Sequence, residues 1–136
     1  MTVFVLDSSA VLRYTDDEAG ADRVDDIFNA CAAGQAEVRI SAVQWGEVAG
    51  VVRKRLGASG QKLILESLML LAPGIVPASA ERAVRAAELR IDRKIAYADA
   101  FALDLAMESG DHVLVTADYD FKAVDDLAQI EFLPLK

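Results

Sequence analysis

Two stretches of the chain have the uninterrupted apolar character of a strand that is buried on both faces. Residues 3–6 read Val-Phe-Val-Leu, and residues 112–116 contain Val-Leu-Val, with no polar alternation in either run. Such runs are typical of the interior strands of a parallel sheet. Shorter strands are predicted over residues 37–41, 75–76 and 130–133.

Between these strands, apolar residues recur at the spacing of helices. Helices are predicted over residues 9–14, 21–33, 43–56, from 59 or 60 to the pair Pro73-Gly74, 80–91 and 99–107. Ser41 is the expected N-cap of the helix 43–56, and Gly57 its expected end. The apolar face of the helix 80–91 is expected to include Val84 and Ile91. Strands alternating with helices predict an α/β fold of three layers, with a central, mainly parallel sheet.

Composition indicates one globular domain over residues 1–136. The chain is 54% hydrophobic, which excludes overall disorder and allows a substantial core. We expect no signal peptide and no membrane-spanning segment, because no apolar run has the required length and flanks. The single cysteine, Cys31, excludes an internal disulfide and indicates a reduced, buried thiol in a cytoplasmic protein. His112 is placed in a turn and interpreted as structural.

The net charge of −8 is unevenly distributed along the chain. Residues 39–62 hold five basic residues against one acid, and residues 82–94 hold five against two. Residues 99–131, in contrast, hold nine acids against one lysine. This segregation predicts basic flanks around an acidic pocket, and ordinary solvated helix faces are the alternative interpretation.

Four acidic residues stand where the predicted elements reach the carboxyl edge of the sheet. Asp7 and Asp118 follow the two interior strands, Glu47 lies in the first turns of the helix after residues 37–41, and Asp99 opens a buried helix. Ligands bind in the crevice outside the carboxyl ends of parallel strands, so we predict that the four side chains share one cleft. We refer to Asp7, Glu47, Asp99 and Asp118 as the acidic quartet.

Two further acids near the quartet carry different expectations. Asp120 follows Asp118 by two residues and faces the same side if the backbone there is extended. Asp104 follows Asp99 by five residues on one helix, a rotation of about 140° around the helix axis. We therefore expect Asp104 to pair with a base or to face solvent.

The clustering of carboxylates predicts a metal site. Carboxylates held together repel one another unless a cation lies between them, and their hard oxygen atoms favour Mg²⁺ or Mn²⁺. Sites of this kind hydrolyse phosphodiesters, because the metal activates a water molecule, neutralises the phosphate and stabilises the leaving oxygen.

Four motifs follow one another along the chain: Leu6-Asp7-Ser8-Ser9-Ala10, Ser41-Ala42-Val43 leading to Glu47, Ala98-Asp99-Ala100, and Thr116-Ala117-Asp118 with Phe121. Each motif alone is weakly specific, but their order and separation are specific. Through this ordered set of motifs the chain resembles the PIN domain family, and within it the VapC type of toxin ribonuclease from bacterial toxin–antitoxin pairs. The resemblance covers nearly the whole chain.

The resemblance implies a metal-dependent endoribonuclease in which the acidic quartet holds Mg²⁺ or Mn²⁺ and carries catalysis, supported by Ser9 and Thr116. Asp120 is added as a supporting residue from its spacing. The resemblance also implies a homodimer and a small antitoxin protein whose tail covers the site. Trp45 could stack on a base or contact the antitoxin, with core packing as the alternative. Candidates for contact with RNA or a partner are Arg53, Lys54, Arg55, Arg90, Arg93 and Lys94.

Three other interpretations remain open at this stage. A phospho-receiver signalling module has a similar size and an Asp after its first strand, but it expects a second acid beside Asp7 and a lysine at a late strand end, where Lys122 fits poorly. A phosphotransferase with Asp7 as nucleophile expects an acid where Ser9 stands. The third is a catalytically weak or silent PIN-fold module that only binds a partner protein.

Overall fold

The computed structural model describes all residues from Met1 to Lys136. Its centre is a sheet of five strands, in the order β3-β2-β1-β4-β5, with every neighbouring pair parallel. The strands are β1 (Thr2–Leu6), β2 (Ala36–Ser41), β3 (Gly74–Val76), β4 (His112–Thr116) and β5 (Gln129–Phe132). The predicted α/β class is confirmed, and the sheet is fully parallel.

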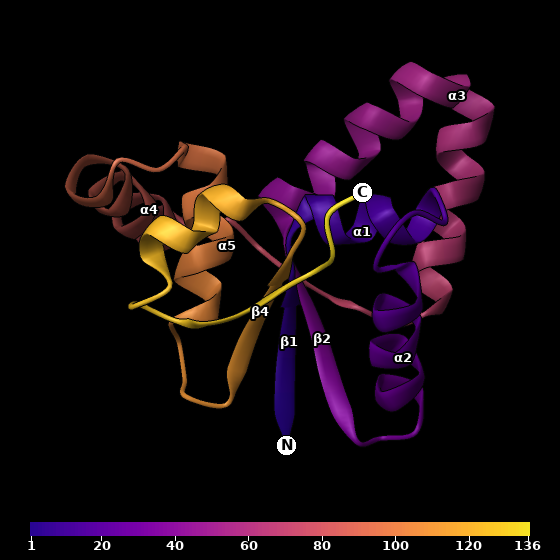
Figure 1. Cartoon of the computed structure of the whole chain (residues 1–136). Helices are drawn as coiled ribbons and strands as arrows, with labels where there is room; N and C mark the ends of the chain where they lie inside the picture. The colour runs from indigo at the N-terminus through magenta and orange to yellow at the C-terminus, as the bar shows by residue number, and fades with distance from the viewer.

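Helices cover both faces of this sheet (Figure 1). On one side lie α1 (Ser8–Thr15), α2 (Ala21–Ala32) and α3 (Ala42–Leu70), and on the other lie α4 (Ala80–Arg93) and α5 (Tyr97–Ala106). A short 3₁₀ helix, η1 (Tyr119–Val124), joins β4 to β5. None of the helices is long and apolar enough to cross a membrane.

The two faces of β1 are buried in different parts of the core. Leu6 packs in a cluster with Ile27 of α2 and other apolar residues, whereas Val5 packs with Leu103 of α5 in a second cluster. Successive side chains of a strand point to opposite faces, so a strand between two helical layers must be apolar at consecutive positions. This explains the uninterrupted run at residues 3–6.

The strand order places a topological switch point between β1 and β4. The chain leaves β1 toward β2 and β3, then returns across the sheet to β4 on the other side of β1. Connections that diverge in this way leave a crevice outside the carboxyl ends of the two strands. The backbone N–H of Asp7 donates to the carbonyl of Val115 across 3.0 Å, which places Asp7 at that crevice.

Helix α3 is bent at Gly57. Gly57 has φ 73° and ψ −174°, outside the helical region, and helix resumes directly after it. A positive φ favours glycine, which has no Cβ. The two predicted helices are thus two arms of α3, and the second begins earlier than residue 59. Ser41 caps the first arm as predicted, since its hydroxyl accepts the N–H of Val43.

Two expectations about burial and one about local structure differ from what the structure shows. Val84 and Ile91 are 58% and 74% exposed, and the residue of α4 that is fully buried is Ala86. Ala86 packs against Ala100 and Phe101 of α5, and Ala83 and Leu89 pack against the same cluster, so the contact face of α4 overlaps the predicted face only in part. Cys31 is half-buried rather than buried. His112 is the first residue of β4, as the predicted strand 112–116 has it, and is buried in that strand rather than placed in a turn.

Candidate active site

Asp7 lies directly beyond the last residue of β1, and its side chain is only 2% exposed. Burial raises the pKa of Asp7, and the charge of Asp118 raises it further. Hydrogen bonds from Ser9, Thr116 and the backbone of Ser8 lower this pKa in part. The buried Oδ1 atom has no hydrogen-bond partner within the chain. One oxygen of this carboxylate is therefore a buried acceptor whose hydrogen-bonding capacity the chain itself does not use.

Ser9 and Thr116 bind the other oxygen of Asp7. The Ser9 and Thr116 hydroxyls donate to Oδ2 across 2.7 and 2.9 Å, and the two hydroxyl oxygens lie 3.1 Å apart. Each hydroxyl also accepts a backbone N–H, from Ala117 at 2.9 Å and from Asp118 at 3.0 Å respectively. These bonds join the start of α1 to the end of β4. They orient Asp7 and the loop that carries Asp118 together.

Glu47 approaches the same region from the second turn of α3. Its side chain is half-buried, and Oε1 is a buried atom without a hydrogen-bond partner. Burial raises the pKa of Glu47; the Ser8 side chain lowers it in part, and the charge of Asp7 raises it. The Coulombic effect between Glu47 and Asp7 indicates that the two carboxylates are near neighbours.

Asp99 lies in the first turn of α5 and is half-buried. Burial is the largest cause that raises its pKa to about 7, followed by the charges of Asp7, Asp118, Glu47 and Asp120. A helix N-terminus favours a negative charge, so burial and repulsion outweigh that effect here. The charges of the other three members of the quartet all act on Asp99, so each of them lies within Coulombic range of this carboxylate.

Asp118 begins a turn rather than an extended segment. Its Oδ1 accepts the N–H of Asp120 across 2.9 Å, which caps η1. The backbone after Asp118 is therefore not extended, because the aspartate side chain stabilises the turn, and the condition under which Asp120 would face the same side as Asp118 is not met. Asp120 is exposed. Its charge nevertheless acts on Asp99.

Gln44 is a residue of the site that the sequence analysis missed. It is fully buried one turn before Glu47, and its Nε2 donates to the carbonyl of Ala98, next to Asp99, across 2.6 Å. This bond links the helix that carries Glu47 to the helix that carries Asp99. The Oε1 atom of Gln44 is buried without a partner. A glutamine on a helix among apolar residues gave no signal of this role.

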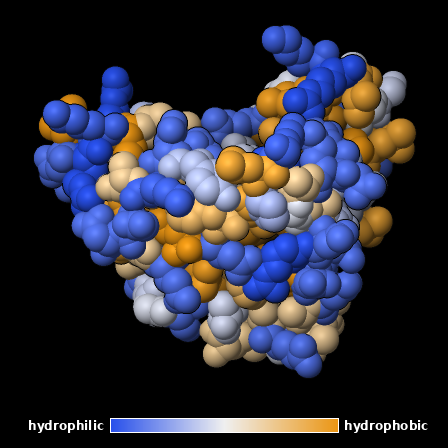
Figure 2. Space-filling model, in the orientation of Figure 1, coloured by the Kyte–Doolittle hydropathy of each residue, from blue (hydrophilic) through white to orange (hydrophobic).

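The quartet lies at the carboxyl edge of the sheet, which faces a hollow between α3 and the α4–α5 side of the molecule (Figures 1 and 2). Figure 2 shows this hollow as a broad depression between two projecting regions. Beside Asp99, a cavity of about 420 Å³ opens between residues 94–96 and η1. We call it the side cavity.

The donor atoms of the quartet fit a hard divalent cation. All four side chains are carboxylates, and the unpartnered oxygens of Asp7 and Glu47 are acceptors that burial has separated from water. Oxygen ligands of this type suit Mg²⁺ and Mn²⁺. No three of the acidic, histidine or cysteine side chains are gathered as a ready-made metal site.

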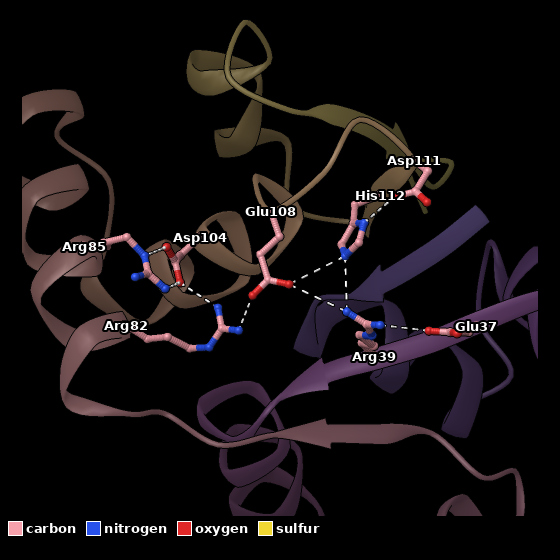
Figure 3. Close-up of polar contacts among 8 residues, drawn as sticks. All are labelled: Glu37, Arg39, Arg82, Arg85, Asp104, Glu108, Asp111 and His112. Atoms are coloured by element: carbon pink, nitrogen blue, oxygen red, sulfur yellow. Dashed lines mark hydrogen bonds and ion pairs between the residues drawn. The ribbon is translucent and has the colours of Figure 1, made fainter. Parts of the chain in front are cut away.

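Asp104 belongs to a separate network on the far part of α5 (Figure 3). Its carboxylate is buried and bonds to Arg82 at 3.0 Å and to Arg85 at 2.6 Å. Arg82 also pairs with Glu108, which lies 3.8 Å from the ring of His112. The expectation that Asp104 pairs with a base is confirmed. Its function is to join α4 to α5, away from the quartet.

Of the six basic candidates, two form ion pairs and four do not. Arg55 pairs with Asp16 at 2.6 Å, and Arg93 pairs with Asp126 at 2.6 Å, so these two charges are partly neutralised. The other four form no ion pair: Arg53, Lys54, Arg90 and Lys94. Trp45 is half-buried and packs against the core cluster that contains Leu6, in agreement with the core-packing alternative.

The PIN domain family model matches residues 4–127 of the chain. The chain belongs to the PIN domain family. The expected family is thereby confirmed, and the phospho-receiver and phosphotransferase interpretations lose their support. None of the curated proteins compared with this PIN domain matches it in sequence.

Solved structures show where else this fold occurs. The VapBC2 complex of Rickettsia felis, bound to a DNA fragment from its promoter, has a TM-score of 0.75 and 16% identity, over 98% of this chain and 100% of that one. VapC20 of Mycobacterium tuberculosis, a toxin that cleaves the sarcin–ricin loop, has a TM-score of 0.68 and 19% identity, over 90% and 95%. VapBC-5 of the same organism has a TM-score of 0.62 and 20% identity, over 99% and 100%. This PIN domain therefore shares its fold with VapBC proteins.

Proposed function

We propose that this PIN domain, as one domain over residues 1–136, is a metal-dependent endoribonuclease and the toxin of a toxin–antitoxin pair. The observation that carries the proposal is the convergence of the quartet on Asp99, whose pKa is raised to about 7 by burial and by the other carboxylates. Such mutual repulsion is unfavourable for folding, and a divalent cation would relieve it. We therefore propose that the quartet binds Mg²⁺ or Mn²⁺. Its four side chains would serve both as metal ligands and as catalytic residues.

The chain's own side chains would hold the reacting groups in place. A divalent cation supplies the positive charge that activates a water molecule and stabilises the phosphate during cleavage. Ser9 and Thr116 fix the orientation of Asp7 by binding Oδ2, which leaves the buried Oδ1 without a hydrogen-bond partner. Without a cation the pKa of Asp99 is raised to about 7, and a bound divalent cation would favour its charged form, so metal binding at neutral pH is expected to release a proton from this carboxyl. Asp120 adds negative charge at the edge of the site.

The relatives support the choice of substrate and partner. VapC20 is a toxin that cleaves the sarcin–ricin loop, and other structures with this fold are VapBC toxin–antitoxin complexes. We infer an RNA substrate, an antitoxin protein that inhibits the site, a homodimeric assembly and a cytoplasmic location. The four basic residues without an ion pair, of which Lys94 lines the cavity beside Asp99, are candidates to guide RNA or to contact the partner.

The decisive experiment is incubation of the purified, antitoxin-free protein with total cellular RNA, with Mg²⁺ or Mn²⁺ and with chelator. We expect discrete RNA fragments with either metal and none with chelator. An absence of fragments would contradict the ribonuclease. If Mn²⁺ still raised the melting temperature in that case, the alternative of a catalytically silent PIN module that only binds a partner would be favoured.

A further inference from the structure

We propose that the side cavity receives the base of a nucleotide next to the scissile phosphate of single-stranded RNA. The inference rests on the proposed ribonuclease function and adds the place where the substrate is held. Asp99 is both a member of the quartet and part of the cavity wall. If the scissile phosphate lies at the quartet, the base of that nucleotide or of the adjacent nucleotide can therefore reach the cavity.

The size of the side cavity suits a base with part of its ribose. Its volume of about 420 Å³ lies in the lower part of the range for small-molecule sites, which is about 300–1,000 Å³. The cavity lies between the loop that joins α4 to α5 and η1, and its lining includes Asp99 in the first turn of α5 and Asp120 in η1. A base in it would therefore be flanked by the same elements that position the carboxylates.

The walls of the side cavity offer an apolar surface held by a rigid aromatic residue. Ile95 and Ala96 line one side, and Tyr119 lines the other. The Tyr119 hydroxyl donates to the carbonyl of Leu133 across 2.8 Å, and its ring packs on Phe132 with centroids 5.0 Å apart. Phe132 is not part of the cavity wall, and the Lys122 ammonium lies 5.2 Å from the centroid of the Tyr119 ring. Single-stranded nucleic acids bind by stacking unpaired bases on aromatic side chains.

Lys94 supplies the charge that a nucleotide needs beside four carboxylates. It lies in the wall of the cavity, is exposed and forms no ion pair, in contrast to its neighbour Arg93. Its backbone has φ 57° at the C-terminus of α4, which directs the chain into the loop that borders the cavity. A phosphate that approaches the quartet is repelled by the carboxylates and attracted by this ammonium group. An RNA backbone is therefore a better match than an apolar protein segment.

The test uses variants that change the cavity without changing a carboxylate. Ala123→Met fills the cavity from η1, at an exposed position. Lys94→Asn removes the charge and retains a residue that tolerates a positive φ. Lys62→Gln, on the second arm of α3, is the control for loss of one positive charge. Equal melting temperatures establish that the variants are folded.

The substrates are an oligoribonucleotide with one cleavage site and two versions with an abasic residue on either side of that site. We expect one of the two abasic versions to lower kcat/KM of the wild type about tenfold, the scale of one stacked base. Ala123→Met should cleave the intact substrate about as slowly as the wild type cleaves that abasic version. Lys94→Asn should weaken binding of all three substrates, and Lys62→Gln should change none of them.

Equal cleavage of all three substrates by the wild type, or wild-type activity of Ala123→Met on the intact substrate, would overturn the proposal. If the wild type cleaves no RNA with Mn²⁺, the ribonuclease function fails separately, and fluorescence anisotropy of the same oligonucleotides then decides. Weaker binding caused by the abasic residue and by Ala123→Met would uphold a base-binding cavity. Unchanged affinity for the oligonucleotides would overturn the base-binding proposal and would favour a protein segment as the occupant of the cavity.

Discussion

The hydroxyl of Thr116 donates a 2.9 Å hydrogen bond to the buried carboxylate of Asp7, although 109 residues separate them in the chain. The two residues meet because β1 and β4 are neighbours at the centre of the sheet. The same hydroxyl accepts the N–H of Asp118. One side chain thus positions two members of the quartet.

Thr116→Val tests this double role, because valine keeps the β-branched shape and removes the hydroxyl. The bond from Thr116 lowers the pKa of Asp7, so its loss should raise that pKa and shift the pH profile of cleavage upward. We expect the free energy of unfolding to fall by about 1–2 kcal/mol, because buried polar groups lose a partner. Thr15→Val, at a threonine that bonds only to a helix carbonyl, is the control. An unchanged pH profile would count against the role of Thr116.

The metal-free protein should lose stability as the pH rises from about 4 to about 7. The folded-state pKa of Asp99 is raised from 3.8 to about 7, and burial raises the pKa of Asp7 and Glu47 as well. The folded state therefore binds more protons than the unfolded state in this interval, and its stability falls as those protons leave. Urea unfolding with chelator at pH 5 and pH 7.5 measures the effect. Asp99→Asn should show a smaller difference between the two pH values than the wild type.

Gln44→Leu should weaken metal binding at the quartet while leaving the stability of the fold nearly unchanged. Leucine has a similar size, and it removes both the bond to the Ala98 carbonyl and the unpartnered Oε1 atom. Replacing a poorly satisfied buried amide by an apolar group can be nearly neutral for stability. We expect a change in melting temperature of less than about 3 °C, together with weaker Mn²⁺ binding by calorimetry. Wild-type Mn²⁺ affinity in this variant would show that the link between α3 and α5 does not position the carboxylates.

Asp104→Asn should lower stability without removing activity. Its carboxylate is buried between Arg82 and Arg85 (Figure 3). Loss of one partner of a buried ion pair costs about 3–5 kcal/mol, but Arg82 keeps Glu108 and asparagine keeps an acceptor. We expect a loss of about 2 kcal/mol in urea unfolding, and cleavage close to wild type well below the melting temperature. Loss of cleavage in a folded variant would place Asp104 in the site after all.

The elements and the positions of the four acids could be predicted from the sequence because they depend on local patterns. The apolar run before Asp7 indicates a strand that is buried on both faces. The loops that follow parallel strands converge at the carboxyl edge of the sheet. The partner of Gln44 could not be predicted, since it depends on the packing of α3 against α5. The exposure of Val84 and Ile91 was missed for a similar reason: an apolar stripe does not reveal which part of it a neighbouring helix covers.

The most direct measurement of the central claim is RNA cleavage by Asp99→Asn, compared with wild type in the presence of Mn²⁺. Asp26→Asn, an exposed aspartate on α2, is the control for the same chemical change. We expect Asp99→Asn to melt slightly higher than wild type without metal, to gain much less stability from Mn²⁺, and to lose cleavage, while Asp26→Asn keeps both properties. Cleavage of RNA by folded Asp99→Asn at the wild-type rate would contradict the assignment of the acidic quartet.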